Sequence, residues 1–289
     1  MNDFLLSVLL GIVEGLTEFL PVSSTGHLRI VEALFHLNLQ DSFWKMYTIV
    51  IQLGAILALP VYFWKRILQF LGTFPKGDRG DRNFLTHPLS LTMIAFVVTA
   101  VPAWALTKVI GKNLESLWVI TLALLVGGIV MWIVDVTFTR PRVMHMEEMS
   151  LPHAIWIGAC QILSAVFPGT SRSMSTIAAG QIVGMSRPAA LEFSFFLSMP
   201  TMAVATLYDL YKTLKPSRDT VREGGIAPLA VSGHEWIVLM IGFVVSFIVA
   251  FVVVAWFMRW VRTKGFAPFA IYRIVLAIVL VILLMRGVI

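Results

Sequence analysis

Residues 11–27 read Gly-Ile-Val-Glu-Gly-Leu-Thr-Glu-Phe-Leu-Pro-Val-Ser-Ser-Thr-Gly-His, and this stretch decides how the chain folds. The apolar residues from 3 to 20 predict a helix, but Pro21 and the polar run after it interrupt that helix. The apolar stretch that follows, 28–39, is too short to cross a hydrocarbon core of about 30 Å. We therefore expect residues 3–39 to form a re-entrant hairpin, in which a helix, a polar break and a half-length helix leave the membrane on the side they entered.

The second half of the chain contains a similar interruption. Residues 153–167 are apolar, and the run Pro168-Gly-Thr-Ser-Arg-Ser follows them before a short stretch that ends near 185. Irregular backbone at membrane depth is tolerated only where it is buried in protein or lines a cavity. A second re-entrant hairpin is therefore expected over residues 153–185.

Composition identifies lipid as the main solvent of the chain. Of its 289 residues, 58% are hydrophobic and only 13% are charged, whereas soluble domains carry about 25% charged residues. Six further apolar blocks each have the length that spans a bilayer. These predicted spans are 43–64, 89–109, 115–137, 188–211, 236–260 and 268–286. We therefore expect an all-α integral membrane protein whose residues 1–289 form a single membrane domain.

The two halves of the chain resemble each other. Aligning the prolines of the two breaks pairs Glu14 with Gln161, Ser23 with Thr170 and Ser24 with Ser171, and the next helices pair Gln52 with Glu192. Each repeat, 1–137 and 148–289, then has one hairpin and three spans. Because three is odd and a hairpin does not change sides, the second repeat should be inverted, which places the site at the repeat interface near the midplane. Gln52 and Glu192 are expected to contact the hairpin residues and hold them in position.

The net charge of +6 indicates contact with membrane surfaces rather than with nucleic acid. The basic residues lie mainly between the apolar blocks, and no compact basic patch is interleaved with aromatic residues. Of the 22 lysines and arginines, eleven fall on the side of the loops at 65–88 and 138–152, nine on the side of the termini, and Arg172 and Arg273 within membrane segments. This small excess favours both termini outside the cell.

Four further expectations concern single residues and the N-terminal segment. The single cysteine, Cys160, excludes an internal disulfide and a CxxC redox or zinc site. The N-terminal segment lacks a basic n-region, and two glutamates interrupt its apolar stretch, so we expect no cleavable signal. Asp135, near a helix end, is expected at the membrane interface, and Arg273 is expected to be either an interfacial anchor or a structural partner.

Glu14 and Glu18 are the first candidates for chemistry. They are four residues apart and therefore share one helical face, where two ionised carboxylates repel each other. Each charge also carries a penalty of a few kcal/mol inside a membrane, on the order of 3 on insertion scales. The pair could hold a divalent ion such as Mg²⁺, which takes oxygen ligands and often bridges to substrate phosphates. The structural alternative is a protonated or hydrogen-bonded pair that helps the halves to pack.

A cluster of hydroxyl groups, glycines and two basic side chains completes the predicted site. Small hydroxyl residues and glycine at a helix break present N–H and O–H donors to an anion. Ser24 beside His27 could supply a nucleophile and a base, and Arg172 could form paired hydrogen bonds to phosphate oxygens. A salt bridge from Arg172 to either glutamate, without a substrate, is the alternative. The further anion-binding candidates are Ser23, Thr25, Gly26, Gly169, Thr170, Ser171 and Ser173.

These two motifs, Glu14 to His27 and Pro168 to Ser173, resemble those of undecaprenyl pyrophosphate phosphatases of the bacitracin-resistance type. The resemblance covers the whole chain, and one departure is Met174, where a small residue, usually glycine, would be expected. It implies a bacterial inner-membrane enzyme of cell-wall synthesis that removes the terminal phosphate of undecaprenyl pyrophosphate at a site opening outward. It also implies that Glu14, Glu18, Ser24, His27 and Arg172 are functional and that a divalent cation, Mg²⁺ or Ca²⁺, is required.

Several alternatives stay open at this point. Either Ser24 attacks the phosphate after activation by His27, or His27 attacks and Glu18 tunes it. Inverted repeats are also typical of carriers, so a transporter or flippase of polyprenyl phosphate lipids is the rival function, and a purely structural membrane protein ranks third. The expected partners are the lipid pyrophosphate and membrane lipids, and the sequence leaves open whether the chain forms a homodimer.

Overall fold

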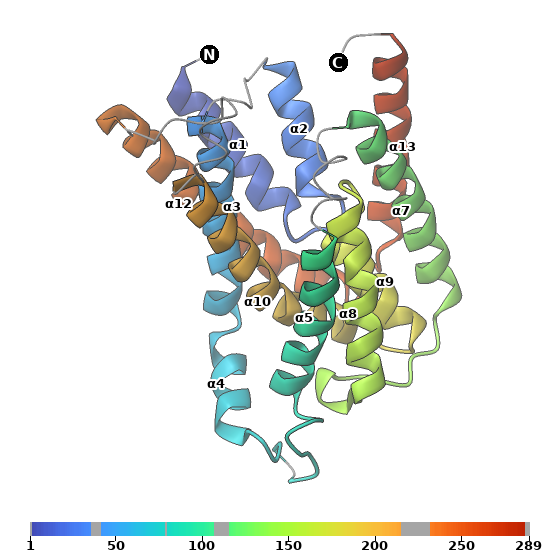
Figure 1. The fold of residues 1–289 in the computed structure, drawn as a ribbon. Helices are drawn as coiled ribbons and strands as arrows, with labels where there is room; N and C mark the ends of the chain where they lie inside the picture. The colour runs from blue at the N-terminus through green and yellow to red at the C-terminus, as the bar shows by residue number, and fades with distance from the viewer. Residues whose placement is uncertain (1, 36–41, 79, 107–115, 215–231, 287–289) are drawn as a thin grey trace.

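The computed structural model describes residues 2–35, 42–78, 80–106, 116–214 and 232–286. In these ranges the chain forms eleven α-helices and one short 3-10 helix, with no β-strand (Figure 1). The helices are α1 (Asp3–Thr17), α2 (Ser24–Leu34), α3 (Ser42–Tyr62), α4 (Trp64–Thr73), α5 (Pro88–Ala105), α7 (Leu117–Thr137), η1 (Met146–Glu148), α8 (Leu151–Val166), α9 (Arg172–Ile182), α10 (Arg187–Leu214), α12 (Gly233–Trp260) and α13 (Ala267–Met285). The predicted all-α class is therefore confirmed.

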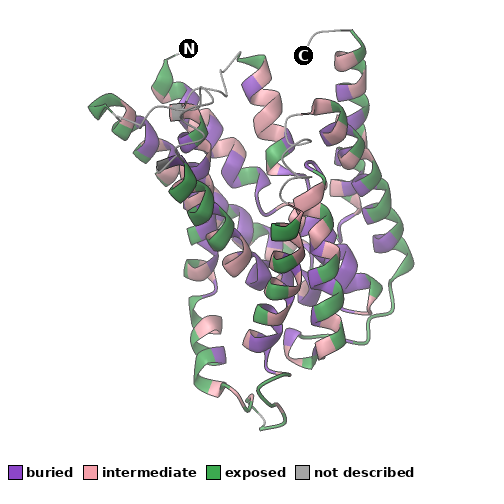
Figure 2. Cartoon of the chain, viewed as in Figure 1, coloured by how far each residue is buried: buried purple, intermediate pink, exposed green. Residues whose placement is uncertain are grey.

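Six of these helices are long and apolar enough to cross a membrane: α3, α5, α7, α10, α12 and α13. They correspond to the six predicted spans, with ends that differ by a few residues. Exposed residues lie along the outer sides of the helices and buried residues lie where helices cross (Figure 2), and the outer sides carry large apolar side chains such as Leu122, Val126 and Ile248. The chain is a multi-pass membrane protein. The predicted segment ends at 36–39 and 107–109 and the first residue of the span 115–137 lie outside the described residues.

Two pairs of shorter helices, α1 with α2 and α8 with α9, contain the predicted breaks. Helices α1 and α8 have 15 and 16 residues, and α2 and α9 have 11 residues each. Eleven residues rise about 16 Å, roughly half the thickness of a hydrocarbon core. In Figure 1, α1 runs inward from the end that holds both termini, and α2 runs back toward that end. The first break therefore lies inside the molecule, and the second lies beside it, because the Ser173 hydroxyl donates to the carbonyl oxygen of Leu20 at 3.0 Å.

Each break ends on a serine with left-handed backbone geometry. Ser23 has φ 73° and Ser171 has φ 70°, and each side chain caps the next helix by accepting a hydrogen bond from the backbone N–H three residues on, at 3.3 Å. A left-handed non-glycine residue costs about 1–3 kcal/mol and persists only where its surroundings hold it. The cap pairs Ser23 with Ser171 and hence Ser24 with Arg172. The sequence alignment of Ser24 with Ser171 was one residue off, because the second break has an extra residue after its proline.

Glycines let α1 and α8 approach the spanning helices closely. A Cβ atom on Gly15 would lie 2.8 Å from the carbonyl oxygen of Ser246 in α12, and one on Gly158 would lie 2.5 Å from that of Ala95 in α5. Both distances are shorter than real Cβ contacts. The first helix of each pair is therefore held directly against the backbone of a spanning helix, and this packing fixes where each break lies.

At the opposite end of the molecule, the structure corrects one expectation and shows how Asp135 is held. The segment 65–88, expected to be a loop, begins with the helix α4, whose apolar side includes the buried Phe70. Asp135, which we expect at the membrane interface, lies near the end of α7 and is 2% exposed. Its carboxylate accepts hydrogen bonds from Arg187 Nε at 2.6 Å and from the backbone N–H groups of Phe266 and Ala267 at 3.0 and 3.1 Å. Asp135 therefore ties the start of α13 to α7 and α10.

We predict that Asp135→Ala lowers the thermal stability of the purified protein. The substitution leaves two buried N–H groups unpaired and removes the partner of the Arg187 guanidinium, which should cost about 2–4 kcal/mol. Thermal unfolding in detergent, followed by intrinsic fluorescence, measures the change in Tm. Asp81→Ala, at an exposed position, is the control and should leave Tm unchanged. Equal Tm values for the two variants would show that the Asp135 contacts do not stabilise the fold.

Candidate active site

The two helix breaks meet at the carboxylate of Glu18. Its Oε1 accepts a hydrogen bond from Arg172 Nη2 at 3.1 Å, and its Oε2 accepts one from Ser24 Oγ. Glu18 follows α1, Ser24 opens α2 and Arg172 opens α9. The Glu18 residue is 8% exposed, so this carboxylate joins the first break to the second break away from solvent. The structure thus brings together three of the residues singled out in the sequence.

The surroundings of Arg172 suit an anion. Helices α2 and α9 both begin at this site, and helix N-termini present free N–H groups and partial positive charge. The guanidinium of Arg172 uses Nη2 on Glu18, but its Nη1 is buried without a hydrogen-bond partner in the described part of the chain. An unpaired buried donor is costly. A phosphate oxygen of a bound ligand would satisfy it.

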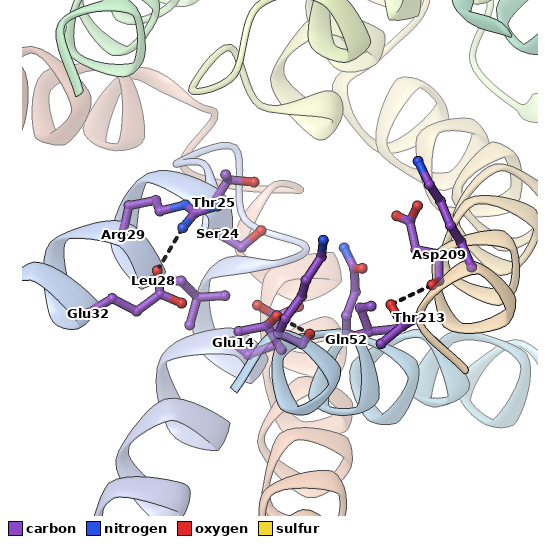
Figure 3. Close-up of a pocket in the computed structure, with 13 residues that line it drawn as sticks. Glu14, Ser24, Thr25, Leu28, Arg29, Glu32, Gln52, Asp209 and Thr213 are labelled. Atoms are coloured by element: carbon purple, nitrogen blue, oxygen red, sulfur yellow. Dashed lines mark hydrogen bonds and ion pairs between the residues drawn. The ribbon is translucent and has the colours of Figure 1, made fainter. Parts of the chain in front are cut away.

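Two adjoining cavities contain these groups. The inner cavity has a volume of about 220 Å³, and its walls include Glu18, Ser23, Ser171 and Arg172. The outer cavity has a volume of about 460 Å³ and is lined by residues of α1, α2, α3 and α10 (Figure 3). Ser24, Thr25 and Gln52 line both cavities. The outer cavity is therefore an approach to the inner one from the end of the molecule that holds both termini.

Glu14 faces the outer cavity (Figure 3). It is 1% exposed, and its Oε1 has no hydrogen-bond partner among the described residues. No cluster of three or more His, Cys, Asp or Glu side chains that could hold a metal ion occurs in the described ranges. Mg²⁺ usually takes one or two protein carboxylates and completes its coordination with water and substrate phosphates. The unpaired oxygen of Glu14 lies one helical turn from Glu18. It therefore fits a divalent ion whose remaining ligands include phosphate oxygens.

His27 lies outside both cavities and contacts α13 instead of Ser24. Its Nδ1 lies 2.7 Å from the carbonyl oxygen of Ser23, to which it must donate. In the neutral imidazole its Nε2 then accepts a hydrogen bond from the hydroxyl of Tyr272 at 2.6 Å, and the two rings stack with centroids 5.6 Å apart. The group in contact with the Ser24 hydroxyl is the Glu18 carboxylate. The geometry therefore favours Glu18 over His27 as the base for Ser24.

The remaining predicted anion-binding residues divide into two sets. Those that line the inner cavity are Ser23, Thr25, Gly169 and Ser171. Those that do not are Gly26, Thr170 and Ser173: Gly26 packs beside Ile120, Thr170 lines an apolar groove between α7, α8 and α9, and the hydroxyl of Ser173 donates to the carbonyl oxygen of Leu20 at 3.0 Å. The Ser173 bond is a direct link from the second break to the first.

Gln52 and Glu192, expected to play matching roles, lie in different surroundings. The side-chain oxygen of Gln52 accepts a hydrogen bond from Thr206 at 3.2 Å, and Gln52 lines both cavities. Glu192 lines neither cavity and pairs with Arg66, whose Nε lies 2.8 Å from the Glu192 carboxylate. Arg66 also pairs with Glu147 at 2.6 Å. Glu192 is therefore drawn toward α4 and η1.

Sequence reasoning missed several residues of the inner cavity. They are Thr99, Gln161, Ser164, Thr201 and Thr206. The Thr99 and Thr201 hydroxyls donate to carbonyl oxygens one turn earlier in their own helices, at 2.9 and 2.7 Å. A threonine can satisfy its hydroxyl in this way anywhere in a membrane helix. Its presence in an apolar block therefore gave no signal of a cavity.

Comparison with known proteins covers nearly the whole chain. Residues 7–279 match the family model described as bacitracin resistance protein BacA. The undecaprenyl-diphosphatase of Koribacter versatilis (strain Ellin345) is 64% identical, over 96% of this chain and 97% of the relative. The undecaprenyl-diphosphatases of Bradyrhizobium sp. (strain ORS 278) and Deinococcus radiodurans are 41% and 36% identical, each over 99% of this chain and over 99% and 97% of the relatives. The matched range 7–279 includes both helix breaks.

Proposed function

Because this chain belongs to the BacA family of bacitracin resistance proteins, we propose that it is an undecaprenyl-diphosphatase. It hydrolyses undecaprenyl pyrophosphate to undecaprenyl phosphate and inorganic phosphate, and so recycles the lipid carrier of cell-wall synthesis. The observation that carries the proposal is the Glu18 carboxylate, which joins the Ser24 hydroxyl of one helix break to the Arg172 guanidinium of the other. This arrangement supports the proposal, because it would supply a base, a nucleophile and a phosphate-binding cation at one place in a membrane protein.

Without substrate, Arg172 is proposed to remain paired with Glu18. When the pyrophosphate enters the inner cavity, its terminal phosphate replaces Glu18 as the partner of Arg172. It also accepts a hydrogen bond from the unpaired Nη1. The N-termini of α2 and α9 and the guanidinium then offset the charge on the phosphoryl oxygens, which is the main requirement of phosphoryl transfer. Glu18 keeps the contact of its Oε2 with Ser24, while its Oε1 is released from Arg172.

In the first step, Ser24 Oγ attacks the terminal phosphorus and passes its proton to Glu18. The bond from this phosphorus to the bridging oxygen breaks, and undecaprenyl phosphate leaves with the electron pair. In the second step, water attacks the phosphoserine, the proton on Glu18 goes to Ser24 Oγ, and Glu18 takes a proton from the water. Inorganic phosphate and one proton are released, so the overall reaction is balanced. His27 is proposed to hold the backbone of the first break in place, through its hydrogen bond to the carbonyl oxygen of Ser23.

We also propose that a divalent cation, Mg²⁺ or Ca²⁺, works with this site. Glu14 and Glu18 would hold it, and it would neutralise charge on the pyrophosphate oxygens. The free Oε1 of Glu14 in the described structure supports this assignment. Glu14→Gln should therefore raise the cation concentration needed for half-maximal phosphate release.

The proposed setting is the bacterial inner membrane, with α1–α2 and α8–α9 as re-entrant hairpins of two inverted repeats. Their half-length helices and the two adjacent breaks support this arrangement. Both termini and the outer cavity lie at one end of the molecule. The proposed orientation places that end outside the cell. The small excess of basic residues at the opposite end supports it, because basic loops favour the cytoplasmic side.

The proposal is tested by phosphate release from undecaprenyl pyrophosphate by the purified protein with Mg²⁺. We expect the wild-type protein to release phosphate, and Arg172→Ala to lower kcat by about 100-fold, because a preorganised donor to the phosphoryl oxygens is lost. Arg140→Ala, at an exposed loop position, is the matched control and should retain full activity. A wild-type protein that releases no phosphate but moves polyprenyl phosphate across vesicle membranes would replace the phosphatase with a transporter.

A further inference from the structure

Arg273 of α13 is the largest fully buried side chain among the described residues, and it contacts both helix breaks. Its Nη1 donates to the carbonyl oxygen of Pro21 at 3.1 Å. Its Nη2 lies within hydrogen-bonding distance of three more carbonyl oxygens, those of Ala123 at 3.1 Å, Gly169 at 3.1 Å and Thr170 at 3.0 Å. One guanidinium therefore binds the first break, the second break and α7 together.

The chain is built to admit this side chain. A Cβ atom on Gly127 of α7 would overlap the Nη2 of Arg273 and lie 3.2 Å from its Cζ, so a side chain at 127 would displace the guanidinium. Arg273 has no carboxylate within ion-pair distance in the described structure, where its guanidinium donates to backbone carbonyls. An arginine at the centre of a membrane helix costs about 3 kcal/mol on insertion scales. A charge buried at this cost without a counter-ion points to a role beyond packing.

The carbonyls that Arg273 binds lie next to the reacting groups. Pro21 is three residues before Ser24, and Thr170 is two residues before Arg172. Between them lie the two left-handed serines, Ser23 and Ser171, whose strained backbone has to be held from outside. Because one guanidinium holds carbonyl groups of both breaks, it fixes the distance between the N-terminus of α2 and the N-terminus of α9.

We propose that Arg273 is a positioning residue that sets the spacing between Ser24 and Arg172. This inference rests on the proposed phosphatase function. A planar guanidinium offers five donors in a fixed fork, whereas a lysine ammonium offers three donors from one point. Lysine at 273 keeps the charge but cannot reach carbonyls on both sides at once. A displacement of about 1 Å at a catalytic site can lower the rate by about 100-fold.

Arg273→Lys is therefore expected to lower kcat by about 10- to 100-fold with little change in KM. Arg187→Lys is the matched control, because Arg187 also ties α7 to another segment, through Asp135, but touches neither break. We expect both variants to lose some thermal stability and only Arg273→Lys to lose kcat. A second readout without turnover is the rise in Tm on adding methylenediphosphonate, which should be present in wild type and Arg187→Lys and reduced in Arg273→Lys.

Gly127→Ala tests the same contact if Arg273→Lys does not yield folded protein. The added methyl would push the guanidinium away from the breaks, while Gly72→Ala, which meets nothing within 4 Å, is its control. An unchanged kcat in Arg273→Lys or in Gly127→Ala, or an equal loss of kcat in Arg187→Lys, would overturn the positioning role. An inactive wild-type protein would instead overturn the proposed phosphatase, so the two failures are distinguishable.

Discussion

Glu18→Gln is expected to lower kcat for phosphate release by a factor of about 10³ or more, the largest effect of any conservative substitution in this protein. The Glu18 carboxylate accepts hydrogen bonds from both Ser24 Oγ and Arg172. A glutamine amide cannot take the proton of Ser24. Its NH₂ group would also face either the hydroxyl or the guanidinium, so one of the two loses its acceptor. The substitution therefore removes the base and loosens the contact between the two breaks.

The measurement is the initial rate of phosphate release at saturating undecaprenyl pyrophosphate, with Tm recorded for every variant. Glu147→Gln is the control, because Glu147 pairs with Arg66 away from both cavities and should keep its rate within about threefold, as expected for a partly exposed ion pair. Glu18→Asp is a second variant that keeps the carboxylate and should recover part of the rate. A Glu18→Gln protein with more than a tenth of the wild-type rate would exclude Glu18 as the general base.

The spans and the two breaks could be predicted from the sequence because each depends on local composition. A run of about 20 apolar residues has few alternatives to a membrane helix. Pro21 and Pro168 each come with a run of small polar residues, and this combination ends the helix before it. Ser24 and Arg172 could be placed near each other because both follow such a break directly. Their convergence needed only that the two halves pack together.

The surroundings of His27 and Arg273 could not be predicted, because their partners are far away along the chain. Tyr272 is 245 residues from His27, and Pro21 is 252 residues from Arg273. His27 stands three residues after Ser24, a spacing that places two side chains on one helical face. In the structure, Ser24 turns back to Glu18, while His27 binds the carbonyl of Ser23 and Tyr272. Sequence spacing fixes which residues share a face, but the partner on the neighbouring helix decides where each side chain binds.

The predicted repeat did not reveal the surroundings of Glu192. Glu192 was expected to match Gln52 of the first half. The side chain of Glu192, however, pairs with Arg66 of α4, and the segment that contains α4 was expected to be a loop. A charged partner from a connecting segment therefore determines where the Glu192 side chain binds.

Ser24→Ala is expected to lower kcat by about 10³-fold, whereas His27→Ala should lower it by only about 10-fold. Removing a nucleophile removes the covalent step, and what remains is the smaller effect of binding and electrostatics. His27 in this structure contacts the loop and Tyr272 rather than the Ser24 hydroxyl, so its loss should disturb the loop without removing a reacting group. Both variants are compared with wild type by phosphate release, with Tyr208→Phe, on an exposed part of α10, as a control.

The chemistry of the trapped enzyme separates the two nucleophiles independently of these rates. If Ser24 attacks, wild-type protein mixed with substrate labelled in its terminal phosphate and quenched within the first turnover carries label that survives acid and is lost in base, as expected for a phosphoserine. If His27 attacks, the label survives base and is lost in acid, because the phosphorus–nitrogen bond is acid-labile. Glu18 touches Ser24 and not His27, so the structure predicts the acid-stable form, absent from Ser24→Ala and still present in His27→Ala. Acid-labile label that persists in Ser24→Ala would show that His27 is the nucleophile. In that case the hydrogen bond between His27 and Tyr272 would have to break during turnover.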